Sequence, residues 1–344
     1  KITQPPMVDV FFKEKTVVMR ADSTFWNRSV PDTLNIQFLN DSTIIQNPRM
    51  DLIQTISNHA EVTVISTGHR PFVCMATGSS NNGSLVIDSD TTFTLVLAGL
   101  DLSSQKVSAI NVLQKHKARI VLADGTLNTL SDATIYQTDS TNTSNGCLYT
   151  KGSFTFTGCG TLSVTGNSRH AISAGKNIMV KEGHIIINNT EKDGLHCDKL
   201  LVEGGTIELH IKTDASKGIK CKENFTMTGG RIEGEATGNL VIVGGETSYC
   251  SFLKSNGTFQ MEGGDIALRH QGDGGRCISV DSNMTMTSGT LNLECHGDGG
   301  SYLTTNNDLD YYTPKCITVD DSLQIKGGSV NCSSIGLGGK GIDL

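Results

Sequence analysis

The residues best suited to chemistry recur in two rows in the second half of this 344-residue chain. The first row opens each copy of a repeated phrase, such as Lys217-Gly-Ile-Lys-Cys, and five of its six members are basic or can become so. Its members are His170, Asp193, Lys217, Arg276, Lys315 and Lys340. The second row lies three positions later and comprises Ser173, His196, Lys220, Ser279, Thr318 and Asp343. Stacked copies of the phrase would form a basic stripe that suits an anionic polymer. In the alternative interpretation, these cations only keep turns soluble and deter edge pairing.

A second group of candidates lies in the segment 296–314, which interrupts the repeat. Its tyrosines Tyr302, Tyr311 and Tyr312 are of a type that stacks on the apolar face of a sugar. Its acids Asp298, Asp308 and Asp310 offer the oxygen ligands that Ca²⁺ prefers, so calcium is the one cofactor that we consider. Two other interpretations stay open: the tyrosines anchor the loop, and each Asp-Gly pair forms a tight turn.

The spacing of the repeat predicts the fold that positions both groups. The second glycine of each glycine turn recurs at intervals of 23, 22, 25, 34, 25 and 39 residues, from Gly160 to Gly328. A unit of 22–25 residues holds two or three short strands, and the alternation in Phe225-Thr-Met-Thr has the period of a half-buried strand. We therefore predict an all-β fold, a single-stranded right-handed parallel β-helix with loop insertions in the two longer units.

The extent of the repeat predicts how the chain is organised. Residues 1–33 lack the repeat and are expected to form an N-terminal extension or cap. Residues 34–344 are expected to form one β-helix, with irregular coils over 34–117 and regular coils over 118–344.

The cysteines are expected to stack in register. The predicted pairs are Cys197 with Cys221, Cys277 with Cys316, and Cys295 with Cys332. Buried free thiols are the favoured interpretation, because reduced cysteine behaves as a small apolar residue. Disulfides between coils and a metal site are the alternatives.

Composition narrows the classes of partner. The net charge of −7 weighs against nucleic acid, which needs a basic footprint. No apolar run approaches the ~18 residues of a membrane span. The chain starts at Lys1 rather than Met, so a removed leader and a secreted or outer-surface location are expected.

One segment carries a family resemblance. It runs Leu122-Ala-Asp-Gly-Thr-Leu-Asn-Thr-Leu-Ser-Asp132 and is followed by the phrases at 147–152 and 160–167 and by the Gly-Ile and Gly-Gly-Thr-Ile repeats. Residues 83–344, and more loosely 34–82, resemble a bacterial carbohydrate-binding family with a pectate-lyase-like right-handed β-helix. The resemblance implies a secreted or surface-attached protein that binds cell-wall polysaccharide and calcium.

In this family, coils often begin with Asp-Gly-Ile, and the stacked aspartates can hold calcium. This chain departs from that pattern. Only Asp193 keeps the acid here. A lone carboxylate does not supply the six to eight oxygens that Ca²⁺ takes, which weighs against calcium in this column.

The sequence thus predicts a non-catalytic polysaccharide-binding protein with a preference for acidic (uronic) glycans. The glycan would bind at the first row, at His196 and Lys220, or under the tyrosine loop. The first alternative is an adhesin or structural protein with cell-surface partners. The further alternative is a calcium-dependent polysaccharide lyase with Arg276 or Lys315 as its base, although no compact acidic cluster lies in register with them.

Overall fold

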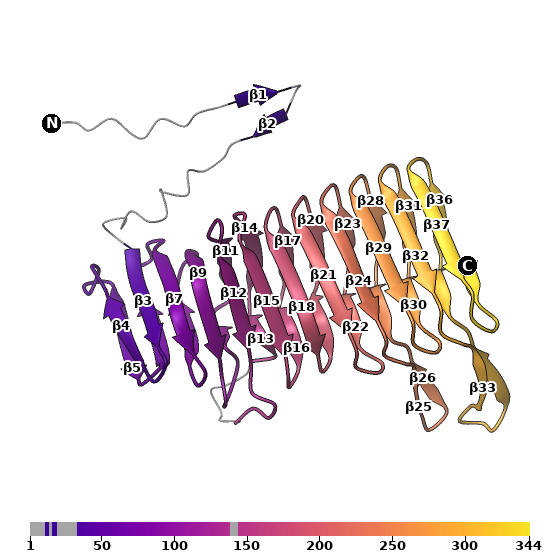
Figure 1. The fold of residues 1–344 in the computed structure, drawn as a ribbon, viewed down its shortest axis with the longest axis horizontal. Helices are drawn as coiled ribbons and strands as arrows, with labels where there is room; N and C mark the ends of the chain where they lie inside the picture. Colours follow the sequence, from indigo (N-terminus) through magenta and orange to yellow (C-terminus); the bar gives the residue numbers. More distant parts are fainter. Residues whose placement is uncertain (1–10, 14–15, 19–32, 138–143) are drawn as a thin grey trace.

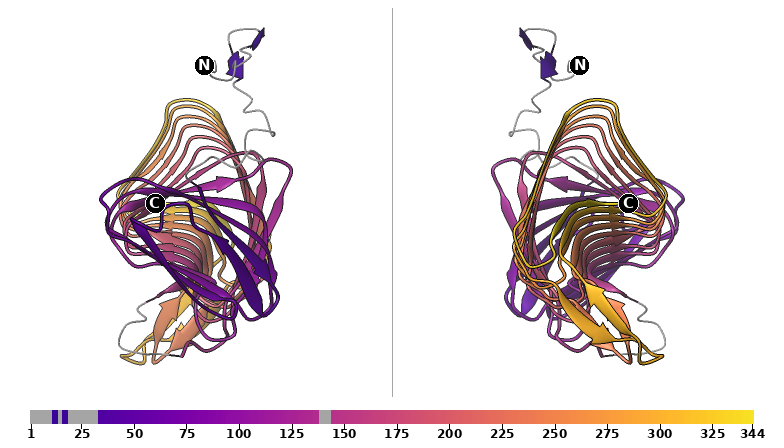
Figure 2. Two further views of the ribbon diagram at one scale, coloured as in Figure 1. Left: turned by 90° about the vertical axis from the view of Figure 1, so that its left-hand side faces the viewer. Right: turned by 90° about the vertical axis from the view of Figure 1, so that its right-hand side faces the viewer.

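The chain folds as the predicted parallel β-helix. The computed structural model describes residues 11–13, 16–18, 33–137 and 144–344, and these contain strands but no helix. Figure 1 shows strands stacked side by side along an elongated body, and Figure 2 shows the coils superposed when viewed from either end. No helix in the described part of the chain is long and apolar enough to cross a membrane.

The first strand of each coil contributes to one sheet, called sheet 1 here. Its strands are β5 (Ile53–Asn58), β6 (Glu61–Ser66), β8 (Ser84–Ser89), β10 (Ile110–Val112), β13 (Gly146–Thr150), β16 (His170–Ala174), β19 (Asp193–Cys197), β22 (Lys217–Cys221), β27 (Ser251–Ser255), β30 (Arg276–Val280), β35 (Lys315–Val319) and β38 (Lys340–Asp343). They lie next to one another in this order, and the pairs from β6 onward are parallel.

The second and third strands of the coils form two further parallel ladders. The second strands are β11 (Lys117–Leu122), β14 (Ser153–Thr157), β17 (Asn177–Val180), β20 (Lys199–Val202), β23 (Phe225–Met227), β28 (Phe259–Met261), β31 (Asn283–Met286) and β36 (Ser322–Ile325). The third strands are β12 (Leu127–Ser131), β15 (Thr161–Gly166), β18 (His184–Thr190), β21 (Thr206–Ile211), β24 (Arg231–Ala236), β29 (Asp265–His270), β32 (Thr290–Cys295) and β37 (Ser329–Ser334).

The N-terminal coils are less regular. Strand β9 (Phe93–Ser103) pairs with both β11 and β12, so one long strand spans two ladders. It also pairs with β7 (Val73–Ser80), which lies against β3 (Thr33–Leu39), and β3 forms a hairpin with β4 (Ser42–Gln46). The strands β1 (Phe11–Lys13) and β2 (Thr16–Val18) pair antiparallel. The rest of the cap expected over 1–33 lies almost wholly outside the described residues.

Vertical stacking of apolar residues builds the core. Leu195 pairs with Ile172 on one side and with Ile219 on the other, and all three are fully buried. The rings of Phe225 and Phe259 stack with centroids 4.8 Å apart in neighbouring coils. Residues about two dozen positions apart are therefore immediate neighbours, as the repeat predicts.

The glycine turns form one corner of each coil. Gly205 has φ +73°, a conformation that residues with a side chain rarely adopt. A Cβ atom there would lie 2.6 Å from the carbonyl oxygen of Gly183 in the preceding coil. The corner thus requires glycine for its backbone conformation and for the close approach of the coils.

Both longer repeat units contain a hairpin. Strands β25 (Val241–Val243) and β26 (Glu246–Ser248) form one, and β33 (Gly300–Leu303) and β34 (Leu309–Tyr312) form the other. Both project from the same side of the body in Figure 1. They approach closely, because a Cβ atom on Gly245 would lie 2.3 Å from the backbone nitrogen of Thr305.

The cysteine predictions are partly confirmed. Cys197 and Cys221 pair in register, and they are buried free thiols, as are Cys277 and Cys316. The pairing of Cys295 with Cys332 is wrong, because Cys295 lies opposite Ser334 and Cys332 opposite Leu293. The Sγ atom of Cys295 instead lies 3.4 Å from that of Cys277 in the same coil.

Candidate functional site

The first row of candidate residues is a continuous column on sheet 1. Asp193 pairs with Lys217, Arg276 with Lys315, and Lys315 with Lys340. Between Lys217 and Arg276, however, the structure inserts Ser251, which pairs with both. The column therefore carries a neutral residue in its middle that the sequence analysis did not include.

The second row of candidate residues, from Ser173 to Asp343, also gains a member from the coil that contains Ser251. Lys254 lies between Lys220 and Ser279 in the register of sheet 1. This coil was not recognisable as a copy, because Phe252-Leu253 stands where the others have a small residue followed by Ile or Leu. The interval of 34 residues before Gly264 was the signal that a further first strand had to fit there.

Five cations gather on successive coils of sheet 1 and form what we call the basic face. They are Lys217, Lys220, Lys254, Arg276 and Lys315, all partly buried. Two of them have acidic partners: Lys254 pairs with Asp281, and Lys315 pairs with Asp343 at 2.5 Å. Lys340, beyond the basic face, also pairs with Asp343, at 2.7 Å.

Lys217 and Lys220 are compensated less well. The Nζ atom of Lys217 donates to the carbonyl of Ala215 at 2.6 Å, and that of Lys220 donates to the side-chain oxygen of Asn256 at 2.5 Å. Burial lowers the pKa of both ammonium groups, and the positive charge of Lys254 lowers each pKa further. The nearby carboxylates act in the opposite direction without cancelling the effect, so this part of the face favours an added negative charge.

Arg276 has an aromatic partner. Its guanidinium carbon lies 3.5 Å from the centroid of the Tyr249 ring, a cation–π arrangement. Its Nε is buried and has no hydrogen-bond partner among the described residues. Tyr249 directly follows strand β26, so the first hairpin covers one cation of the basic face.

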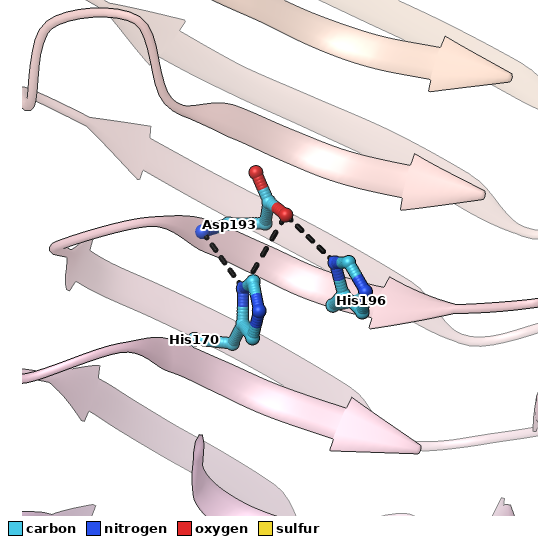
Figure 3. A group of neighbouring side chains, drawn as sticks. All are labelled: His170, Asp193 and His196. Carbon is cyan, nitrogen blue, oxygen red and sulfur yellow. Dashed lines mark hydrogen bonds and ion pairs between the residues drawn. The ribbon is translucent and has the colours of Figure 1, made fainter. Parts of the chain in front are cut away.

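His170, Asp193 and His196 form a compact cluster at the N-terminal side of the basic face (Figure 3). The Nδ1 atom of His196 lies 2.7 Å from Oδ2 of Asp193, and that of His170 lies 3.3 Å from the same oxygen. The backbone N–H of Asp193 donates to Nδ1 of His170 at 3.1 Å. The two imidazole rings stack with centroids 4.1 Å apart.

Burial and charge set the protonation of this cluster. Burial lowers the pKa of His170 to about 3, so its ring is neutral at pH 7. Burial opposes ionisation of Asp193, but the hydrogen bond from His196 and neighbouring positive charge outweigh it and hold the pKa of that carboxyl below its usual range. The cluster thus combines neutral imidazole with a carboxylate.

The predicted tyrosines do not form one platform. Tyr311 and Tyr312 are consecutive in strand β34 and therefore point to opposite faces of the hairpin. Tyr311 is 65% exposed, whereas the ring of Tyr312 packs close to Gly274 of the body and to Gly300, its partner in the hairpin. The hydroxyl of Tyr302 donates to Asp310 at 2.8 Å. Tyr312 therefore anchors the hairpin, and Tyr311 is left exposed.

The three aspartates proposed for calcium are not brought together. Asp298 accepts the N–H of Leu337 at 2.8 Å and donates its own N–H to Asp273 at 2.8 Å, as part of a ladder between loops. Asp310 accepts from Tyr302 and from the N–H of Tyr311, and the N–H of Asp308 donates to Thr304. In the described ranges, these three carboxylates form no shared group able to hold a metal ion. The Asp-Gly turn forms at Asp273-Gly274, where the N–H of Gly275 donates to the carbonyl of Gly272 at 3.1 Å, and not at Asp298-Gly299.

Comparisons with known proteins agree with this architecture. A 25% identical relative from Acetivibrio thermocellus, a carbohydrate-binding domain-containing protein, aligns over 158 residues, or 45% of this chain and 53% of the relative. The chain thus spans about half the length of this curated relative. A solved structure, the gadolinium derivative of a polysaccharide lyase-like protein from C. thermocellum, superposes with a TM-score of 0.60 at 23% identity. That superposition covers 76% of this chain and 96% of the other, and it shows a shared fold.

The family assignment follows from a match that covers most of the chain. A family model described as carbohydrate-binding domain-containing protein matches residues 58–338. This range includes sheet 1 from β6 to β35 and both hairpins. The resemblance seen in the sequence is thereby confirmed: the chain belongs to the carbohydrate-binding domain-containing family.

Proposed function

We propose that this protein binds an acidic polysaccharide along the basic face without cleaving it. The observation that carries the proposal is the run of five cations on successive coils, in which Lys217 and Lys220 have no acidic partner within ion-pair distance among the described residues. Coils of a parallel β-helix repeat about every 4.8 Å, so the cations present charge at a regular spacing to an extended polymer. A polymer with a carboxylate on each sugar complements such a row.

The chemistry of the surrounding acids supports a non-catalytic role. Asp193, Asp281 and Asp343 each contact a histidine or lysine side chain. They are separated along the face rather than gathered into a set of oxygens for Ca²⁺, which takes six to eight such ligands. A calcium-dependent elimination reaction would need that set beside its base. Secretion or attachment to the outer cell surface is part of the proposal, since cell-wall polymers lie there.

The test compares two double variants that remove the same charge. Lys217→Gln/Lys220→Gln alters the basic face, and Lys181→Gln/Lys326→Gln removes two exposed lysines at the glycine corner that follows the second strands β17 and β36, away from sheet 1. We expect the first variant to lower the affinity for polygalacturonate by roughly tenfold, about 1.4 kcal/mol, and the control to leave it unchanged in isothermal titration calorimetry. Equal affinities in both variants would contradict the assignment.

Two further measurements separate the alternatives. Tyr311→Ala should leave the affinity unchanged, because Tyr311 lies on a hairpin outside the basic face; a loss would move the site to the hairpin. Incubation with polygalacturonate and Ca²⁺ should give no rise in absorbance from unsaturated product. Steady product formation that Arg276→Ala abolishes would establish the lyase, and failure to bind any glycan on an array would favour an adhesin.

A further inference from the structure

Three metal-ligating side chains lie close together on sheet 1, next to the basic face but not part of it. His170 comes from strand β16, and Asp193 and His196 come from the adjacent strand β19 (Figure 3). One ligand atom from each residue lies within 4.8 Å of the other two, and in the described part of the chain this is the group of metal-ligating side chains that meets that condition. All three side chains are largely buried, so water competes weakly for them.

We propose that His170, Asp193 and His196 bind a divalent first-row transition metal ion, for which Zn²⁺ is the natural probe. Imidazole nitrogen with one carboxylate oxygen is a donor set typical of zinc and its neighbours. It is a poor set for Ca²⁺, which requires six to eight oxygens. The site therefore differs from the calcium site considered for the aspartates of the tyrosine loop.

The distances between donor atoms are close to those of a coordination sphere. With metal–ligand bonds of about 2.1 Å, adjacent ligands lie about 3.0–3.4 Å apart in octahedral or tetrahedral geometry. Oδ2 of Asp193 lies 3.3 Å from Nδ1 of His170 and 2.7 Å from Nδ1 of His196. Both nitrogens thus lie near the same carboxylate oxygen. Small movements of the side chains would let all three atoms bind one ion.

Two local changes complete the site. The imidazole planes are 23° apart, so the nitrogen lone pairs lie in nearly parallel planes, and rotation of the less buried His196 ring about its side-chain bonds lets both rings point to one ion. The metal ion also replaces the backbone N–H of Asp193 as the partner of Nδ1 in His170. Three protein ligands leave at least one coordination position for water or another oxygen ligand.

A second histidine–carboxylate group on the same molecule provides a matched control. Glu208 contacts His184 through Oε2 at 3.0 Å and His210 through Oε1 at 2.8 Å. Its histidines therefore bind different oxygens of the carboxylate, and their side chains are 37% and 41% exposed. This arrangement is that of two surface contacts rather than one three-ligand site.

The experiment titrates the untagged 344-residue protein with ZnCl₂ by calorimetry and follows the visible absorption of Co²⁺ as a second probe. His196→Gln and Asp193→Asn each remove one ligand, and His184→Gln/His210→Gln is the control. We expect one Zn²⁺ per chain, with affinity lowered more than about tenfold in both single variants, since loss of even an outer-shell partner typically costs about 10–100-fold. The control should bind as the wild type does, and excess Ca²⁺ should not compete.

Several outcomes would overturn the proposal. These are no saturable Zn²⁺ binding by the wild-type protein, affinity unchanged in His196→Gln, or affinity lost only in the His184→Gln/His210→Gln control. Far-UV circular dichroism confirms that each variant is folded. Glycan binding is measured separately, so failure of this site leaves the assignment of the basic face unaffected.

Discussion

At the scale of single residues, the partners of each cation decide what it can offer a ligand. Lys254 and Lys315 are paired with Asp281 and Asp343, which offsets part of the positive charge that they offer a ligand. Lys217 and Lys220 instead bond to neutral oxygens, and the two together make the uncompensated part of the basic face. The row of basic positions was predictable from the repeat. Of the two acidic partners, Asp343 belongs to the second row, whereas Asp281 was not predictable because it lies beyond the end of its strand and belongs to neither row.

A buried histidine away from this face predicts how the free energy of unfolding depends on pH. Burial lowers the pKa of His270 from 6.5 to about 4, and its Nδ1 accepts the N–H of Gly272 at 3.2 Å. Because the unfolded state binds the proton more tightly, this histidine stabilises the fold fully above pH 6.5 and progressively less as the pH falls toward 4. From this residue alone, we expect the free energy of unfolding to be about 2 kcal/mol lower at pH 5 than at pH 7.

Urea denaturation of the wild type and of His270→Gln at both pH values measures this contribution. The glutamine amide keeps an acceptor near Gly272 but does not titrate, so the wild type should lose more stability than the variant on acidification. An identical loss in both proteins would show that His270 is not the group responsible.

At the scale of elements, the coils with an intact repeat phrase were predictable from the sequence, and the coil that contains β27 was not. Gly-Ile or Cys-Ile marks the first strand in coils such as β22 and β30, and the structure confirms their register. Strand β27 reads Ser-Phe-Leu-Lys-Ser, with a buried Phe252 at the position that Gly218 and Cys277 occupy in the neighbouring coils. The hairpins also escaped prediction, since their strands pair only with each other and carry no repeat signal.

The glycine corner gives a prediction at this scale. Gly205→Ala should lower the free energy of unfolding by about 1–3 kcal/mol, because a Cβ atom meets the carbonyl of Gly183 and the φ of +73° is strained for alanine. Gly99→Ala is the matched control, since Gly99 has φ +78° but no atom within 4 Å of a Cβ. Thermal or urea unfolding should show the larger loss for Gly205→Ala. Equal losses would mean that strain alone, rather than crowding between coils, governs this corner.

At the scale of the whole molecule, stacking converts a sequence repeat into an extended surface. The cations from Lys217 to Lys315 span three coil steps, about 14 Å along the axis. The hairpins end immediately before β27 and β35, so they border this surface at its C-terminal half. A flat, regularly spaced row suits a polymer better than a single sugar.

Two dependences follow from a linear electrostatic surface. Affinity for oligogalacturonates should rise with chain length and level off once the oligomer spans the basic face. It should also fall as salt increases from about 0.1 M to about 1 M, where the Debye length shrinks from about 10 Å to about 3 Å. Calorimetry across a length series at both salt concentrations checks both. Affinity independent of length and salt would instead indicate one neutral pocket.

The most direct test of the account is lysine footprinting. Amine labelling followed by mass spectrometry, with and without polygalacturonate, reports which ammonium groups the polymer covers. We predict protection of Lys217, Lys220 and Lys254, with Lys181 and Lys326 at the glycine corner labelled equally in both states. Bound polymer that leaves the first three lysines unprotected would contradict the assignment of the basic face as the glycan-binding surface.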